Sequence, residues 1–427
     1  MLDIKLIRTQ PDFVRERLAF RSEEDAAQIP VLLDLDVRHR AGLTRQEQIN
    51  AEVNTKSKEI GVLMQSGKRE EAKELQEAVR ALKAESEGLS TQVREDEEAL
   101  QTILSRLPNL LHESVPPGGE ENNIVLRTVG EPRRFSFKPK PHWEIAENLG
   151  LIDFARGAKI TGSGFVLYRG DGALLERGLV QFMLDMHVTE HGYTEWSTPY
   201  FLNRDSITAS GHIVKFTPEM YHDAEDDLYA LPTAEPALVN IHRGEILDES
   251  LLPLDYVAYS PCWRREAGAA GKDTRGLLRV HQFDKVEMVK VTMADRSYDE
   301  LEKMLQNAID VIERLGLTYR VLALAAKDVS FAMAKTYDIE LHSPGVDRWL
   351  EVSSVSNGTD FQSRRGNVRY RAAKDGGKPA FAHLLNGSGT ALPRLVAALL
   401  ETYQQEDGSV ELPEVLGPYL RGKTKLG

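Results

Sequence analysis

The chain has 427 residues, of which 41% are hydrophobic and 28% charged, and its formal net charge is −13. This length allows two or three domains with a large buried core, and the composition is ordinary for a soluble globular protein. No run of about 18 apolar residues occurs, a single cysteine excludes an internal disulfide framework, and the acidic balance argues against unspecific nucleic-acid binding through the whole surface.

Residues 1–30 have the pattern of one or two short helices. The first residues, MLDIKLIRTQPDF, lack the basic start, apolar centre and small-residue cleavage site of a signal peptide. We therefore expect a cytoplasmic protein without a membrane partner.

The segment from roughly Val31 to Leu107 contains no proline and is rich in Glu, Lys, Arg, Gln and Ala. Its second half carries apolar residues in an alternating four-three spacing, which is typical of a coiled-coil seam. These residues are Leu75, Val79, Leu82, Leu89, Val93, Leu100, Ile103 and Leu107. The pattern breaks around Ser66 and Gly67, where glycine permits a turn. The segment therefore predicts an antiparallel helical hairpin with arms of roughly 50 Å.

Basic residues gather near the predicted turn of the hairpin, whereas acidic residues lie near its base at positions 95–98. The residues that could contact phosphates are Lys56, Lys58, Lys68 and Arg69. A cationic tip could bind phosphates far from the body of the protein. A solvated charged face, a rigid spacer or a dimerisation rod are the alternatives.

After a turn-rich linker at residues 116–123, the pattern becomes mixed strand and helix. One apolar helical stripe predicts a core helix and consists of Leu174, Leu175, Leu179, Phe182, Met183 and Met186. Two glycine-rich segments do not qualify as nucleotide motifs. EAGAAGKD has Glu266 where a P-loop begins with glycine, and NGSGTALPR lacks the third glycine of a dinucleotide-binding loop.

Two predicted strands within residues 256–291 carry the strongest chemical signal. The first ends in Arg264, Arg265 and Glu266, and a loop rich in Gly, Lys and Arg follows. On the return strand Arg279, His281, Phe283, Lys285 and Glu287 share parity and therefore one face. Such a face suits a base stacked on Phe283 beside phosphate-binding arginines. An exposed hairpin with ordinary ion pairs is the alternative. Cys262 is expected in the core and His281 in a structural or positioning role.

These residues resemble the second signature motif of the class II aminoacyl-tRNA synthetases. The first motif resembles the segment of about 173–200, a helix followed by YTEWSTPY. The third resembles residues of about 380–403, with Arg394 preceded by Pro393 where members commonly have glycine. Within the class the whole chain resembles the bacterial seryl-tRNA synthetases, most specifically in PTAE at 232–235, KTYDIE at 335–340 and EVSSVSN at 351–357.

The resemblance implies an α+β fold, with a catalytic domain on a six- or seven-stranded antiparallel sheet at residues 111–427. Residues 1–110 would form a tRNA-binding domain with the coiled-coil arm. The implied activity is ATP-dependent activation of L-serine and its transfer to tRNA(Ser), and also to tRNA(Sec). The implied assembly is a homodimer formed through the first motif.

The resemblance also implies the roles of individual residues. Serine would be bound by Thr233, Ala234, Glu235, Arg264, Glu287, Asn386 and Ser388. ATP would be bound by Arg264, Arg265, Glu266, Val280, Phe283, Glu351, Val352, Ser353, Ser354 and Arg394. Glu351 and Ser354 would coordinate Mg²⁺, and no zinc is expected. The alternatives are a ligase that loads a carrier protein and a coiled-coil interaction protein with an inactive catalytic domain.

Overall fold

The computed structural model describes residues 1–267, 275–373 and 376–427. The chain divides into two compact units, residues 2–108 and residues 109–427 together with Met1. None of the helices in the described ranges is both long and apolar enough to cross a membrane.

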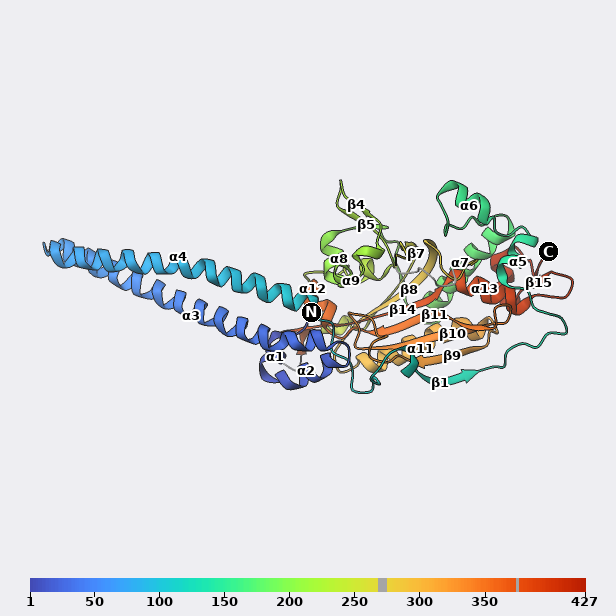
Figure 1. Ribbon diagram of the computed structural model, residues 1–427, viewed down its shortest axis with the longest axis horizontal. Coiled ribbons are helices and arrows are strands. Elements are labelled where there is room, and N and C mark those ends of the chain that lie inside the picture. Colours follow the sequence, from blue (N-terminus) through green and yellow to red (C-terminus); the bar gives the residue numbers. More distant parts are fainter. Residues whose placement is uncertain (268–274, 374–375) are drawn as a thin grey trace. The chain divides into compact units, whose positions relative to one another are not determined.

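The first unit consists of helices only (Figure 1). Two short helices, α1 (Ile4–Thr9) and α2 (Pro11–Ala19), precede the long helices α3 (Glu23–Gln65) and α4 (Arg69–Arg106). The turn between the long helices contains Gly67, whose φ of 77° is a conformation that glycine adopts without a steric penalty. The helical hairpin and the position of its turn are therefore confirmed.

The predicted start of the first long helix near Val31 is wrong, because α3 begins at Glu23 and contains Pro30. The Ser22 side chain caps the helix by accepting a hydrogen bond from the backbone N–H of Asp25. Three acidic residues in the first turn add a favourable interaction with the helix dipole. The stabilisation from this cap and these acidic residues exceeds the cost of the one backbone hydrogen bond that Pro30 removes.

The predicted seam of the hairpin is confirmed, since every apolar residue of the series on α4 and Leu107 after it is buried or half-buried. Gly42 on α3 faces this seam, and a β-carbon at that position would lie 2.6 Å from Val93 Cγ2. The polar seam residue Asp96 accepts a hydrogen bond of 2.9 Å from Arg38, which satisfies the buried carboxylate. On α4 the packing thus follows residues that the sequence pattern identified. On α3 the weaker predicted series of Leu43, Val53, Ile60 and Met64 is wrong at Leu43 and Met64, which are exposed, because Gly42 and Ile49 are the residues that are buried there.

The second unit is built on a sheet of eight described strands in the order β1-β9-β10-β11-β14-β8-β7-β2 (Figure 1). Their bounds are β1 Ile124–Val129, β2 Thr194–Glu195, β7 Leu254–Trp263, β8 Gln282–Thr292, β9 Tyr319–Ala323, β10 Lys335–Ser343, β11 Arg348–Asn357 and β14 His383–Ala391. All neighbours are antiparallel except β2 and β7. The fold class is confirmed, but six or seven strands is wrong, because β1 and the short β2 add an edge strand on each side.

Three helices bury apolar faces against this sheet, namely α7 (Asp171–Thr189), α11 (Ser297–Arg314) and α13 (Leu392–Tyr403). All six residues of the predicted apolar stripe are buried on α7, which confirms the core helix. The shorter helices are α5 His142–Asn148, α6 Phe154–Ile160, α8 Arg204–Ser210, α9 His212–Lys215, α10 Glu235–Leu238 and α12 Phe361–Gly366.

The remaining described strands form three small sheets. Their bounds are β3 Phe201–Asn203, β4 His222–Asp223, β5 Leu228–Ala230, β6 Ile246–Asp248, β12 Arg369–Ala372, β13 Lys378–Phe381, β15 Val410–Glu411 and β16 Lys425–Leu426. The short helices α9 and α10 contribute His212 and Glu235 to the cavity described next.

Candidate active site

A cavity of about 330 Å³ lies over the central strands of the second unit. Fourteen of the residues expected at the site line it: Thr233, Glu235, Arg264, Glu266, Val280, Phe283, Glu287, Glu351, Val352, Ser353, Ser354, Asn386, Ser388 and Arg394. Two do not. Ala234 is fully buried beside the cavity, and Arg265 is exposed, with its backbone N–H donating to the carbonyl of Glu219.

The return strand differs from its prediction at its start, because β8 begins only at Gln282. Phe283, Lys285 and Glu287 share one face of this strand and line the cavity, as their parity predicted. Arg279 reaches the cavity from the preceding turn, where it forms an ion pair with Glu266. His281 also precedes the strand, and its ring stacks on Phe165 with centroids 5.4 Å apart. The fully buried Cys262 is a core residue, as predicted.

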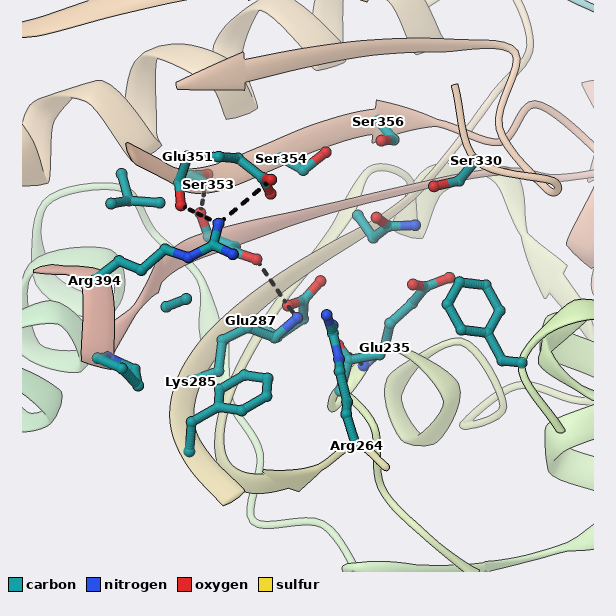
Figure 2. A pocket seen from close by; sticks show the side chains of 18 of the residues that line it. Glu235, Arg264, Lys285, Glu287, Ser330, Glu351, Ser353, Ser354, Ser356 and Arg394 are labelled. Atoms are coloured by element: carbon teal, nitrogen blue, oxygen red, sulfur yellow. Dashed lines mark hydrogen bonds and ion pairs between the residues drawn. The ribbon is translucent and has the colours of Figure 1, made fainter. Parts of the chain in front are cut away.

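Arg264 lies at the end of β7 and points into the cavity (Figure 2). Its guanidinium carbon is 5.2 Å from the ring centroid of Phe283, which is a cation–π distance. Its Nε donates a hydrogen bond of 3.3 Å to the carbonyl oxygen of Pro232. The His281 ring lies 3.0 Å from the Arg264 carbonyl oxygen through Nδ1, so the histidine supports the backbone at this arginine. Most of the loop that follows, residues 268–274, lies outside the described residues, as does most of the P-loop-like segment.

Arg394 lies in the first turn of α13, directly after Pro393. The proline fits there because the first turn of a helix does not need its missing N–H. Arg394 donates to two backbone carbonyls, with Nη1 at 2.7 Å from Glu351 O and Nε at 3.2 Å from Leu278 O. Its Nη1 is also 3.5 Å from a Glu351 carboxylate oxygen. Figure 2 shows Arg394 beside Glu351, Ser353 and Ser354 of β11.

Glu351 and Ser354 offer carboxylate and hydroxyl oxygens, the ligand type that Mg²⁺ prefers. Asp338 of β10 lies directly opposite Ser354, and its Oδ1 is buried without a hydrogen-bond partner. Burial, and then the charge of Glu351, raise the pKa of Asp338 well above its usual value. These oxygens therefore fit a hard cation, although the described residues hold no group of three or more His, Cys, Asp or Glu that could bind a metal by themselves.

Two buried carboxyl groups, those of Glu235 and Glu287, line another part of the cavity, where Figure 2 also shows Lys285 and Arg264. Glu235, at the start of α10, accepts a hydrogen bond of 2.6 Å from Gln362. Glu287 on β8 lies 2.5 Å from Lys285 Nζ and 3.4 Å from Ser388 Oγ. Burial raises the pKa of both carboxyl groups, and the positive charge of Lys285 acts in the opposite direction on both. The oxygens of these two carboxyl groups can accept hydrogen bonds from an ammonium group.

Three residues near these carboxylates had no role assigned from the sequence. Lys285 was noted only by its parity, and Gln362 and His212 carried no pattern that marks a binding residue. His212 lines the cavity, and its Nε2 lies 4.0 Å from a Glu235 carboxylate oxygen. Burial, followed by the charges of Arg264 and Lys285, lowers the pKa of His212 to about 4, so this imidazole is neutral at pH 7.

Comparison with known proteins identifies the family. The chain matches the seryl-tRNA synthetase N-terminal domain over residues 1–111 and the class II tRNA synthetase core domain (G, H, P, S and T) over residues 216–403. It is 48% identical over 421 residues to a serine–tRNA ligase of Methylacidiphilum infernorum, covering 99% of both chains. It is also 48% identical to that of Thermomicrobium roseum, covering 100% of this chain and 95% of the relative.

A solved structure agrees with these matches. It is a seryl-tRNA synthetase from Pyrococcus horikoshii complexed with ATP, with a TM-score of 0.94 and 37% sequence identity. The similarity covers 100% of this chain and 99% of that one. The chain described here therefore belongs to the seryl-tRNA synthetase family of class II aminoacyl-tRNA synthetases.

Proposed function

We propose that this protein is an ATP-dependent ligase that activates L-serine and transfers it to tRNA(Ser). The observation that carries the proposal is one cavity in which the carboxyl groups of Glu235 and Glu287 lie at one end, Phe283 and Arg394 lie at the other, and Arg264 contacts Phe283 and also faces the two carboxyl groups. The first end suits the ammonium group of an amino acid, and the second suits a nucleotide. Relatives named serine–tRNA ligase and a solved relative complexed with ATP support it.

ATP would lie along the ends of β7, β8 and β11. Phe283 would stack on one face of the adenine, and Arg394 would stack on the other and reach the γ-phosphate. Glu266 would accept from the adenine amino group, and the backbone near Val280 would lie along the ring edge. Arg264 would bind the α-phosphate and the serine carboxylate. Val352, Ser353 and the exposed Arg265 complete the proposed set.

Serine would be recognised through its ammonium group by Glu235 and Glu287. Thr233, Asn386 and Ser388 would line the pocket for the side-chain hydroxyl, with Ala234 beneath them. Such a site forms hydrogen bonds with the serine hydroxyl. It rejects alanine, because alanine would leave buried polar groups of the site without a hydrogen-bond partner, which is costly in free energy.

The activation step requires no protein nucleophile. The serine carboxylate attacks the α-phosphorus in line, the bond to the bridging oxygen breaks, and pyrophosphate leaves with seryl-adenylate formed. A terminal ribose hydroxyl of tRNA then attacks the seryl carbonyl, and AMP leaves. The side chains contribute positioning and charge stabilisation. Glu351 and Ser354 would hold Mg²⁺, which supplies charge neutralisation at the phosphates when it is bound.

The basic residues near the hairpin turn of the first unit support a tRNA partner. Lys58, Lys68 and Arg69 are exposed near the hairpin turn, and Lys56 is half-buried. Contacts from such a tip to the backbone of helical RNA suit recognition by shape, since the deep groove of A-form RNA hides base edges. Charging of tRNA(Sec), a homodimer formed through residues 173–200 and a cytoplasmic location belong to the same proposal.

Pyrophosphate exchange with ATP, run with each of the twenty amino acids, tests the first half of the proposal. Exchange with serine, followed by seryl-tRNA formation when tRNA(Ser) is added, is the expected result. Exchange without transfer would identify a ligase that loads a different carrier. Absence of exchange with every amino acid would refute the enzymatic function.

A further inference from the structure

Lys285 is buried in the part of the cavity where we place the ammonium group of serine. Its side chain is 7% exposed and that of Glu287 is 3% exposed. The two residues are two positions apart on β8 and therefore lie on the same face of the strand. A lysine so deeply buried requires a compensating negative charge, and Glu287 supplies it at 2.5 Å.

The charged groups around this ion pair balance one another when the cavity is empty. Those facing it from the neighbouring elements are Arg264 after β7, Glu235 at the start of α10 and His212 on α9, with the neutral groups Cys262, Thr233 and Ser388. Two carboxylates are thus matched by two permanent cations, because His212 is neutral. Removal of Lys285 would leave one buried carboxylate without a counter-charge, and burial favours its protonation.

A protonated Glu287 could not attract an ammonium group by charge. We propose that Lys285 is a positioning residue that holds Glu287 as a carboxylate in the empty pocket, so that the arriving serine ammonium meets a charged partner. This inference rests on the proposed function and adds to it a residue that determines the pH range of serine binding. Lys285 acts through Glu287 and takes no part in the bond-forming step.

The chain contains a matched control on the same strand. Lys290 of β8 is 4% exposed and forms two ion pairs, 3.0 Å to Asp255 and 2.8 Å to Glu300. It lies on the opposite face of the strand and does not line the cavity. A Lys290→Met variant therefore removes an equally buried lysine without touching the proposed serine pocket.

The experiment measures the serine KM of full-length wild type, Lys285→Met, Lys285→Arg and Lys290→Met by pyrophosphate exchange between pH 6 and 8.5, together with their melting temperatures. A neighbouring opposite charge lowers a carboxyl pKa by about 1–3 units, so Lys285→Met should raise the serine KM about tenfold or more at pH 6. The ratio of the variant KM to the wild-type KM should fall as the pH rises, because Glu287 then ionises without help. Lys285→Arg keeps the positive charge and should show the same pH dependence of the serine KM as wild type. In the Lys285 variants the KM for ATP should stay within about twofold of wild type.

A serine KM ratio that is flat with pH would overturn the inference, as would the same pH dependence in Lys290→Met. Should Lys285→Met not fold, Lys285→Gln replaces it, because its amide can still donate a hydrogen bond to Glu287; its KM ratio must fall with pH in the same direction. Failure of the proposed function looks different, since wild type itself would then show no serine-dependent exchange, and the inference would fall with it.

Discussion

Replacement of Glu401 by glutamine should destabilise the second unit strongly although it changes only one atom. Glu401 Oε1 accepts from the backbone N–H of His142 at 2.8 Å and from His142 Nδ1 at 2.7 Å. Nδ1 carries the proton, because Nε2 accepts from the backbone N–H of Leu277 at 2.9 Å. Oε2 accepts from Gly345 N at 2.8 Å and Val346 N at 3.3 Å, and from the Ser343 hydroxyl.

A glutamine at this position has one acceptor oxygen and one amide nitrogen. With the nitrogen in place of Oε1, both donors of His142 lose their acceptor. With the nitrogen in place of Oε2, the two backbone N–H groups of Gly345 and Val346 lose theirs, while the Ser343 hydroxyl can rotate. Either orientation leaves two buried donors unsatisfied at about 1–3 kcal/mol each, which totals about 2–6 kcal/mol. Over residues 109–427, an unfolding entropy of about 2.1 cal/mol/K per residue converts this loss to about 3–9 °C in Tm.

Differential scanning calorimetry of wild type, Glu401→Gln and the exposed control Glu411→Gln measures this effect. Burial by itself raises the pKa of Glu401, but the hydrogen bonds from His142 and Ser343 outweigh it, so that pKa lies below its usual value. The carboxylate therefore stabilises the fold above the unfolded pKa and loses this effect as pH falls through the folded pKa. The Tm difference should be full at pH 7 and shrink below about pH 4.3. A Glu401→Gln protein that melts within 1 °C of the Glu411→Gln control at pH 7, or a gap that grows in acid, would refute this reasoning.

Three further predictions concern the site and the arm. Arg394→Gln should lower kcat/KM for serine-dependent exchange roughly 100- to 1000-fold with an unchanged fold by circular dichroism; an effect under about tenfold would remove Arg394 from the site. Alanine at Lys56, Lys58, Lys68 and Arg69 together should weaken tRNA binding and reduce its salt slope by up to about 3, as measured by filter binding at several salt concentrations, while amino-acid activation stays the same. Unchanged affinity and slope would remove the tip from the interface. Gly42→Ala should lower the melting temperature because its β-carbon would meet Val93, whereas Gly61→Ala, with nothing within 4 Å, should add up to about 1 kcal/mol; thermal circular dichroism with both effects of the same sign would contradict the packing argument.

The hairpin could be predicted from the sequence because its packing repeats every 3.5 residues, so each residue of the seam adds to the same signal. The start of α3 could not, because a proline normally interrupts a helix, and the proline-free segment from which the hairpin was predicted begins only after Pro30. Helix ends depend on a few side chains around one turn, and such signals compete without a repeating pattern to decide between them.

The site shows the same division. Strand parity placed Phe283, Lys285 and Glu287 on one face, since side chains alternate along a strand. It failed for Arg279, which precedes β8 and is directed by its ion pair with Glu266, a residue with a φ of 51°. Gln362 reaches Glu235 across 127 residues, and no local pattern records such a contact. The resemblance to the family supplied residue roles that periodicity could not.

Helix α13 carries two charged residues, Arg394 and Glu401, that both support the wall of the cavity. Arg394 and Glu401 are seven residues apart, which is about two helical turns, so both lie on one side of the helix. Arg394 holds the carbonyl of Leu278, and Glu401 holds His142, which in turn accepts from the N–H of Leu277. Leu277 and Leu278 both line the cavity, so one helix fixes adjacent residues of its wall through two separate routes. Loss of Glu401 should therefore also raise the KM for ATP, because this part of the cavity wall would then be fixed by Arg394 alone, and Arg394 must also bind the substrate. Replacement of the exposed Glu411 should leave the KM for ATP unchanged.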